Sequence, residues 1–236
     1  MATAGDVTES GAMPSTLRSF AAVVCWVVLA ACTPQHALLA SLIPSGTVNT
    51  VLGNLERVSE ENYKRVVELE TRGDWKGLAT FADANLAKDR FNTDWMLLAG
   101  YARTQLGEHA AAADVYARAA QLEPDNATAW HLLAQSHRAA GEPHRAVNVL
   151  NNALLGLRNP ALTYYLLGES YGDLGRTADA IAAYREALKI EQKFPAAWFS
   201  LARSYQKLGR SGEAREAELA LEKLDPKLAQ RLRGGS

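Results

Sequence analysis

Apolar and small residues recur along most of the chain at helical spacing. Within residues 164–174 they fall at i, i+3, i+4, i+7 and i+10, which places them on one stripe of a helix. Residues 180–188 carry the stripe of a second helix. Gly175 stands between the two stripes, and glycine adopts the left-handed conformation that ends a helix at little steric cost. The pattern therefore predicts two antiparallel helices.

This helix pair is one copy of a unit that repeats every 34 residues. Each copy has a glycine between its helices, an alanine five residues later and a small residue seven residues earlier. Because each pair can bury its apolar face only against its neighbours, such units stack into a solenoid. The positions are Gly107, Gly141, Gly175 and Gly209; Ala112, Ala146, Ala180 and Ala214; and Gly100, Ala134, Gly168 and Ala202.

The repeat closely resembles the tetratricopeptide repeat. An aromatic residue opens each first helix, and a Leu-small pair, a tyrosine and a closing proline follow. Trp95 departs from the pattern by falling one residue early, and Arg158 and Gln192 stand where proline is usual. The resemblance implies an all-α fold, a right-handed α-solenoid of antiparallel helix pairs. The residues that carry it are Trp130, Tyr164 and Trp198; Leu133-Ala134, Leu167-Gly168 and Leu201-Ala202; Tyr171 and Tyr205; and Pro124 and Pro226.

The repeats divide the chain. About four good copies and one degenerate N-terminal copy around Gly73 occupy residues 59–226. Residues 47–58 are predicted to form an amphipathic helix that leads into them. At the other end, Asp225-Pro226 begins a capping helix, so that residues 227–236 comprise this cap and a flexible tail. Its apolar stripe, which should face back onto the solenoid, is Leu228, Ala229 and Leu232.

The N-terminal segment has the features of a targeting signal. Residues 20–31 are uncharged and hydrophobic, which is too short for a bilayer span of about 20 residues and suits the core of a signal peptide. The sequence Leu29 to Cys32, LAAC, resembles the lipobox of bacterial lipoprotein precursors. That resemblance implies cleavage after residue 31 and a lipid on Cys32. Two alternatives remain, a buried core helix and an uncleaved membrane anchor.

The resemblance also implies a location. A lipid on Cys32 would hold the protein in a bacterial cell envelope, facing the periplasm, with residues 32–58 as tether and lead-in helix. Thr33 is not the aspartate that tends to retain such proteins at the inner membrane, so the outer membrane is favoured. Signal peptides begin with a positively charged region, but the charged residues within positions 1–12 are both acidic, Asp6 and Glu9. Met13 is therefore the expected natural start.

Charge and cysteine content argue against nucleic-acid binding and against disulfide bonds in the repeats. The formal net charge is −1, with 25 basic and 26 acidic residues and no run of five like charges, so the chain lacks the footprint of a nucleic-acid-binding protein. Both cysteines lie in the N-terminal segment, and no thiol pair can staple the repeats. Packing alone must stabilise the solenoid.

In the tetratricopeptide family the first helices line a concave groove, and this implies where a partner binds. The corresponding positions here are mainly aromatic or apolar with a polar border, which favours an amphipathic helix or a hydrophobic peptide of a protein partner. The alternative is that some of these aromatic side chains pack between repeats and complete the core. The predicted groove residues are Tyr63, Leu97, Tyr101, His131, Gln135, Arg138, Tyr165, Glu169, Asp173, Phe199, Arg203 and Lys207, with Val67 and Glu70 beside them.

No motif points to catalysis, a cofactor or a metal. The four histidines of the repeats, His109, His131, His137 and His144, include no i, i+4 pair, and no phosphate loop or nucleophile–base arrangement occurs. The sequence therefore predicts a lipid-anchored scaffold that assists assembly of an envelope complex, similar to pilotins or export-system lipoproteins. Alternatives are a periplasmic maturation adaptor held by an uncleaved N-terminal helix and a histidine-dependent metal-binding protein.

Overall fold

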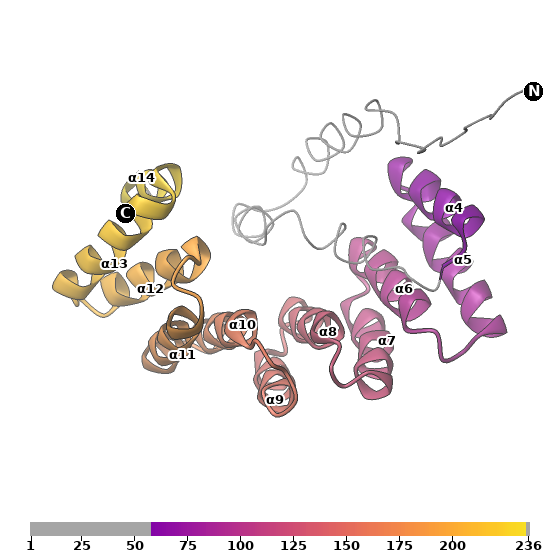
Figure 1. Cartoon of the computed structure of the whole chain (residues 1–236), viewed down its shortest axis with the longest axis horizontal. Coiled ribbons are helices and arrows are strands. Elements are labelled where there is room, and N and C mark those ends of the chain that lie inside the picture. The colour runs from indigo at the N-terminus through magenta and orange to yellow at the C-terminus, as the bar shows by residue number, and fades with distance from the viewer. Residues whose placement is uncertain (1–57, 235–236) are drawn as a thin grey trace, which may run out of the picture. The chain divides into compact units, whose positions relative to one another are not determined.

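The computed structural model describes residues 58–234 (Figure 1). Within this range the chain is all helical, with eleven helices and no strand, which confirms the predicted fold class. The predicted signal peptide of residues 1–31, the predicted lipidation site Cys32, and the predicted tether and lead-in helix up to residue 57 lie outside the described residues.

The helices form antiparallel pairs, and each packs mainly on its neighbours along the chain (Figure 1). We call the side formed by the first helices of the pairs the inner face, and the side formed by the second helices the outer face. The first helices are α4 (Glu60–Thr71), α6 (Thr93–Gln105), α8 (Ala127–Ala139), α10 (Ala161–Asp173) and α12 (Pro195–Lys207). The second helices are α5 (Trp75–Lys88), α7 (His109–Leu122), α9 (Pro143–Ala153), α11 (Thr177–Ile190) and α13 (Ser211–Leu224), after which comes α14 (Pro226–Gly234).

The turn inside each pair depends on its glycine. Gly175 has a φ of 71°, in the left-handed region that side chains disfavour. Around it the amide of Arg176 donates to the carbonyl of Tyr171 at 2.9 Å, the bond that closes a Schellman motif. Gly73, Gly107, Gly141 and Gly209 adopt the same conformation, which confirms the predicted helix ends.

The helix starts keep the phase of the repeat even where the signature departs from it. Asn92 and Asn126 are N-caps of α6 and α8, and their side chains accept from the amides of Trp95 and Ala129 at 3.2 Å each. Met96, which is fully buried, occupies the repeat position that Trp130 holds in the next copy. The early tryptophan is therefore a change of side chain and not of helix register.

The unusual loop residue Gln192 is also explained. Its backbone carbonyl accepts a hydrogen bond from Nε1 of Trp198 at 2.8 Å. Two repeats earlier, the carbonyl of Pro124 accepts from Nε1 of Trp130 at 2.9 Å. Every residue supplies this carbonyl, so the contact does not require proline.

Small residues in the first helices make room for large ones in the second. A Cβ added to Gly168 in α10 would lie 2.4 Å from Cε1 of Tyr184 in α11. Gly100 in α6 meets Tyr116 in α7 in the same way, at 2.5 Å. In the two other well-formed repeats alanine replaces the glycine, and Leu150 and Glu218 hold the tyrosine position. The first pair, α4 and α5, has Val66 and Ala82 there. Glycine thus accompanies tyrosine, as the close approach of the two backbones requires.

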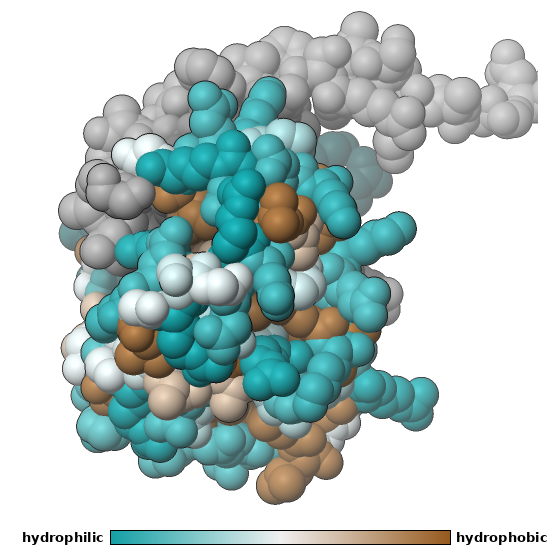
Figure 2. All heavy atoms as spheres, turned by 90° about the vertical axis from the view of Figure 1, so that its left-hand side faces the viewer, coloured by the Kyte–Doolittle hydropathy of each residue, from teal (hydrophilic) through white to brown (hydrophobic). Residues whose placement is uncertain are grey.

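The C-terminal helix α14 covers the last pair. Leu228, Ala229 and Leu232 are its buried residues, and Oδ1 of Asp225 accepts from the amide of Leu228 at 2.9 Å. These residues are the stripe that the sequence predicts. The surface at this end of the molecule is largely hydrophilic with separate hydrophobic patches (Figure 2), as expected of a terminal cap.

Candidate partner-binding site

Most of the apolar residues predicted to line the groove are buried. Tyr165 is 1% exposed, Phe199 and Leu97 are each 5% exposed, and Tyr101 is 6% exposed. Only Tyr63, in α4, remains open to solvent at 40%. Tyr101, Tyr165 and Phe199 therefore pack in the core, as the alternative interpretation of the sequence expects.

The contacts of Tyr165 explain why its side chain is buried and not exposed in a groove. Its ring centroid lies 5.9 Å from that of Tyr184 in the partner helix and 5.1 Å from that of Phe194, which precedes α12. Aromatic pairs at these separations add to the free energy gained by burial. Tyr165 therefore joins two consecutive repeats, and it is not free to anchor an incoming peptide.

The polar residues of the predicted border form a network across repeats. Glu169 in α10 accepts hydrogen bonds from the hydroxyls of Tyr184 at 2.6 Å and Ser200 at 2.9 Å. Arg138 in α8 lies 3.6 Å from the same carboxylate and donates from Nε to Asp173 at 2.6 Å. Three successive repeats meet at these side chains.

Burial and pairing act in opposite directions on Arg138, whose side chain is 11% exposed. Burial works to lower the pKa of the guanidinium, but the hydrogen bond to Asp173 and the charges of Glu169 and Asp173 hold that pKa above its usual value. Burial, reinforced by the charge of Glu169, raises the pKa of Tyr184 well above its usual value. The network therefore consists of a charged guanidinium, two carboxylates and neutral hydroxyls.

His131 and Tyr101 also make contacts between neighbouring first helices. Nε2 of His131 lies 2.8 Å from Oγ1 of Thr163, which is fully buried, and burial lowers the pKa of His131 to about 4. The hydroxyl of Tyr101 donates to Glu70 at 3.3 Å, and its ring meets Trp75 edge to face. Burial raises the pKa of Glu70, although the Tyr101 hydrogen bond opposes this.

Four of the predicted residues are exposed on the inner face: Tyr63 in α4, Asp173 in α10, and Arg203 and Lys207 in α12. Gln135 is half-buried between them and the core. The guanidinium of Arg203 lies 5.8 Å from the ring centroid of Phe199, so a cation covers the buried aromatic ring. A partner at this face would meet polar and charged groups first.

In residues 58–234 no group of three or more His, Cys, Asp or Glu side chains is placed to hold a metal ion. None of the helices in that range is both long and apolar enough to cross a bilayer.

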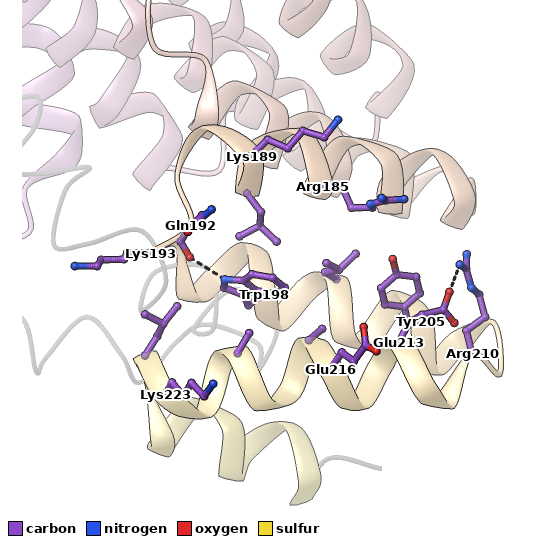
Figure 3. Close-up of a pocket in the computed structure, with 15 residues that line it drawn as sticks. Arg185, Lys189, Gln192, Lys193, Trp198, Tyr205, Arg210, Glu213, Glu216 and Lys223 are labelled. Carbon is purple, nitrogen blue, oxygen red and sulfur yellow. Dashed lines mark hydrogen bonds and ion pairs between the residues drawn. The ribbon is translucent and has the colours of Figure 1, made fainter.

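Sequence reasoning missed a groove on the outer face. It lies between α11 and α13 over α12, has a volume of about 700 Å³, and is floored by Trp198, Leu201 and Tyr205 (Figure 3). The signal in the sequence is Ala220, which is small at a position that holds Arg118, Asn152 and Glu186 in the three preceding repeats.

Comparison with known families now agrees with this architecture. Residues 105–187 match the model described as "Anaphase-promoting complex, cyclosome, subunit 3". Residues 168–209 match a model described as "TPR repeat", and residues 195–228 match one described as "Tetratricopeptide repeat". No curated protein matches the chain in sequence.

Solved structures show the same fold. A crystal structure of MamA is 24% identical, covers 73% of this chain and 99% of its own, and has a TM-score of 0.62. MamA from Desulfovibrio magneticus RS-1 is 17% identical, covering 71% and 94%, with a TM-score of 0.61. YrrB, described as a TPR protein with an unusual peptide-binding site, is 15% identical, covering 80% and 98%, with a TM-score of 0.56. The chain therefore carries tetratricopeptide repeats, arranged as an α-solenoid of antiparallel helix pairs.

Proposed function

We propose that the chain is a lipid-anchored scaffold of the bacterial cell envelope, and not an enzyme, that holds a protein partner on its inner face and assists assembly of an envelope complex. The observation that carries the binding function is the repeat fold itself, whose first helices present Tyr63, Arg203 and Lys207 to solvent. YrrB, a structure of similar fold, is described as having a peptide-binding site, which supports a peptide or protein partner.

The structure changes which contacts a partner would use. Tyr165 and Phe199 are buried, so only a rearrangement of the repeats would expose them. The exposed cations of α12, Arg203 and Lys207, the exposed carboxylate of Asp173 and the exposed ring of Tyr63 are the predicted groove groups that a partner can reach in the described state. The proposed inner-face contact is accordingly polar and charged, with Tyr63 as its exposed aromatic group.

The lipid anchor rests on the LAAC sequence that ends at Cys32, outside the described residues. Metabolic labelling with radioactive palmitate tests it in a bacterial host. The wild-type chain should incorporate label, and the Cys32→Ser variant should not. Absence of label on the wild type, or label that survives the substitution, would refute the anchor and leave the adaptor with an uncleaved N-terminal helix.

A crosslinked pull-down from native membranes tests the inner face. The variant Arg203→Glu, Lys207→Glu reverses two exposed charges of α12, while Lys76→Glu, Lys88→Glu makes the same change in net charge on α5, a second helix. An envelope protein captured by wild type and by the α5 variant, but lost by the α12 variant, supports the proposal. Equal capture by all three chains contradicts it.

A further inference from the structure

Two residues on one wall of the outer groove are small. Ala217 and Ala220 lie on the wall formed by α13. In α9, 68 residues earlier in the chain, Val149 and Asn152 hold the same repeat positions. In α11, the helix directly before, these positions hold Ala183 and Glu186. The last groove thus lacks side-chain volume at the position of Ala220 relative to both earlier helices, and at the position of Ala217 relative to α9. Its volume of about 700 Å³ falls within the range of about 300–1,000 Å³ typical of ligand sites.

The aromatic residue at one end of the groove is held in place. The indole of Trp198 is half-buried, and its Nε1 donates to the carbonyl of Gln192 at 2.8 Å. In Figure 3 the ring lies between α11 and α13, and Tyr205 lies toward the opposite end. A ring already fixed in this way loses little conformational freedom when a ligand packs against it.

Positive charge gathers around the tryptophan. Lys193 and Lys223 line the groove near Trp198, and no ion pair of either lysine within 4.0 Å occurs among the described residues (Figure 3). Lys189 contributes a third cation on the α11 wall, although it also pairs with Glu186 at 2.6 Å.

The opposite end of the groove differs. There Arg210 is neutralised by its ion pair with Glu213, and Arg185 and Glu216 add one charge of each sign (Figure 3). The groove therefore has a positive end at Trp198 and an end at Tyr205 whose charges balance. A bound chain of one sign would be drawn to one end and oriented by the difference.

We propose that this groove is a second docking site, distinct from the inner face, for an acidic peptide segment of a protein partner. An apolar side chain of the peptide fills the space over Ala217 and Ala220 and packs on Trp198. Carboxylates next to it in the peptide pair with Lys193 and Lys223 and replace the water around these exposed cations. The second site allows one solenoid to hold two partners at once.

Selection from a library of short random peptides displayed on phage tests the site, with the full chain in mild detergent as the target. The selected peptides should combine acidic residues with a large apolar one. Binding of these peptides should weaken roughly tenfold or more in the variant Ala217→Val, Ala220→Asn, which fills the groove with the residues of α9. That variant should fold, since the same residues already occupy these positions in an earlier repeat, and circular dichroism verifies it.

Two charge variants complete the design. Lys193→Glu, Lys223→Glu should abolish binding of the selected peptides, and raised salt should weaken wild-type binding. Arg203→Glu, Lys207→Glu on the inner face changes the net charge equally and should leave it unaffected, which separates this site from the proposed function. The proposal is overturned if no acidic, apolar peptides are enriched, if the filled variant binds them as wild type does, or if the inner-face variant loses them equally.

Discussion

Replacing Gly168 by alanine tests how closely the two helices of a repeat approach. In α10 the new Cβ would lie 2.4 Å from Cε1 of Tyr184, a ring that is 3% exposed and hydrogen-bonded to Glu169. Such overpacking costs about 1–3 kcal/mol. The same change raises helix propensity by about 1 kcal/mol, because glycine in a helix interior is the less favourable residue. The net effect on the free energy of unfolding is a loss of up to about 2 kcal/mol.

Gly172 provides a matched control one turn further along α10. A Cβ there would meet only the hydroxyl of Tyr184 at 4.0 Å, an ordinary contact. Gly172→Ala should therefore stabilise the protein by about 1 kcal/mol from propensity alone. The two variants should differ by about 1–3 kcal/mol, measured as the shift in urea midpoint by circular dichroism. If Gly168→Ala stabilises the chain as much as Gly172→Ala, the close approach to Tyr184 is not real.

Three further changes probe the packing. Glu169→Ala leaves the buried Arg138 short of one partner and two hydroxyls without an acceptor. Urea unfolding should therefore show a loss of about 2–4 kcal/mol in the free energy of unfolding. Asp173→Ala, at a carboxylate 43% exposed, should cost less. Because the pKa of His131 in the folded chain, about 4, lies below its unfolded value of about 6.5, the unfolded chain binds the extra proton and stability should fall as pH drops from about 6.5 to 4, by at most about 3 kcal/mol. The neutral variant His131→Gln should show a flatter pH profile in parallel titrations, and an identical profile would contradict the assignment. Ala180→Leu, at a residue 1% exposed, should overpack by about 1–3 kcal/mol, and an unchanged thermal midpoint would count against the register.

The fold could be predicted from the sequence because the residues that begin, end and pack the helices recur at a fixed interval. A glycine such as Gly175 ends a helix by a local rule, and the rule holds whatever surrounds it. The apolar stripe of α14 followed from the same reasoning, since Leu228 and Leu232 lie one turn apart on one face. Local geometry was enough for both.

The state of the inner face was not readable in the same way. Periodicity places Tyr165 on the side of α10 that faces the neighbouring first helices, but its burial depends on how closely the next repeat approaches, which Phe194 and Tyr184 decide. Glu169 likewise gave the sequence signature of an exposed border residue, whereas two hydroxyls from different helices converge on it. Contacts between repeats depend on the angle between neighbouring repeats, and the 34-residue period of the sequence does not determine that angle.

The accommodation of Tyr184 by Gly168 has a consequence for how this solenoid can be rearranged. Gly100 and Gly168, Tyr116 and Tyr184, and Trp130 and Trp198 are each separated by 68 residues, twice the repeat length. From α6 to α13, neighbouring repeats are thus two different types that alternate, with glycine and tyrosine in one type and alanine with a smaller or polar side chain in the other. Splicing the first helix of one type to the second helix of the other would set alanine against tyrosine. The natural unit of duplication, deletion or grafting in this chain is a block of two repeats.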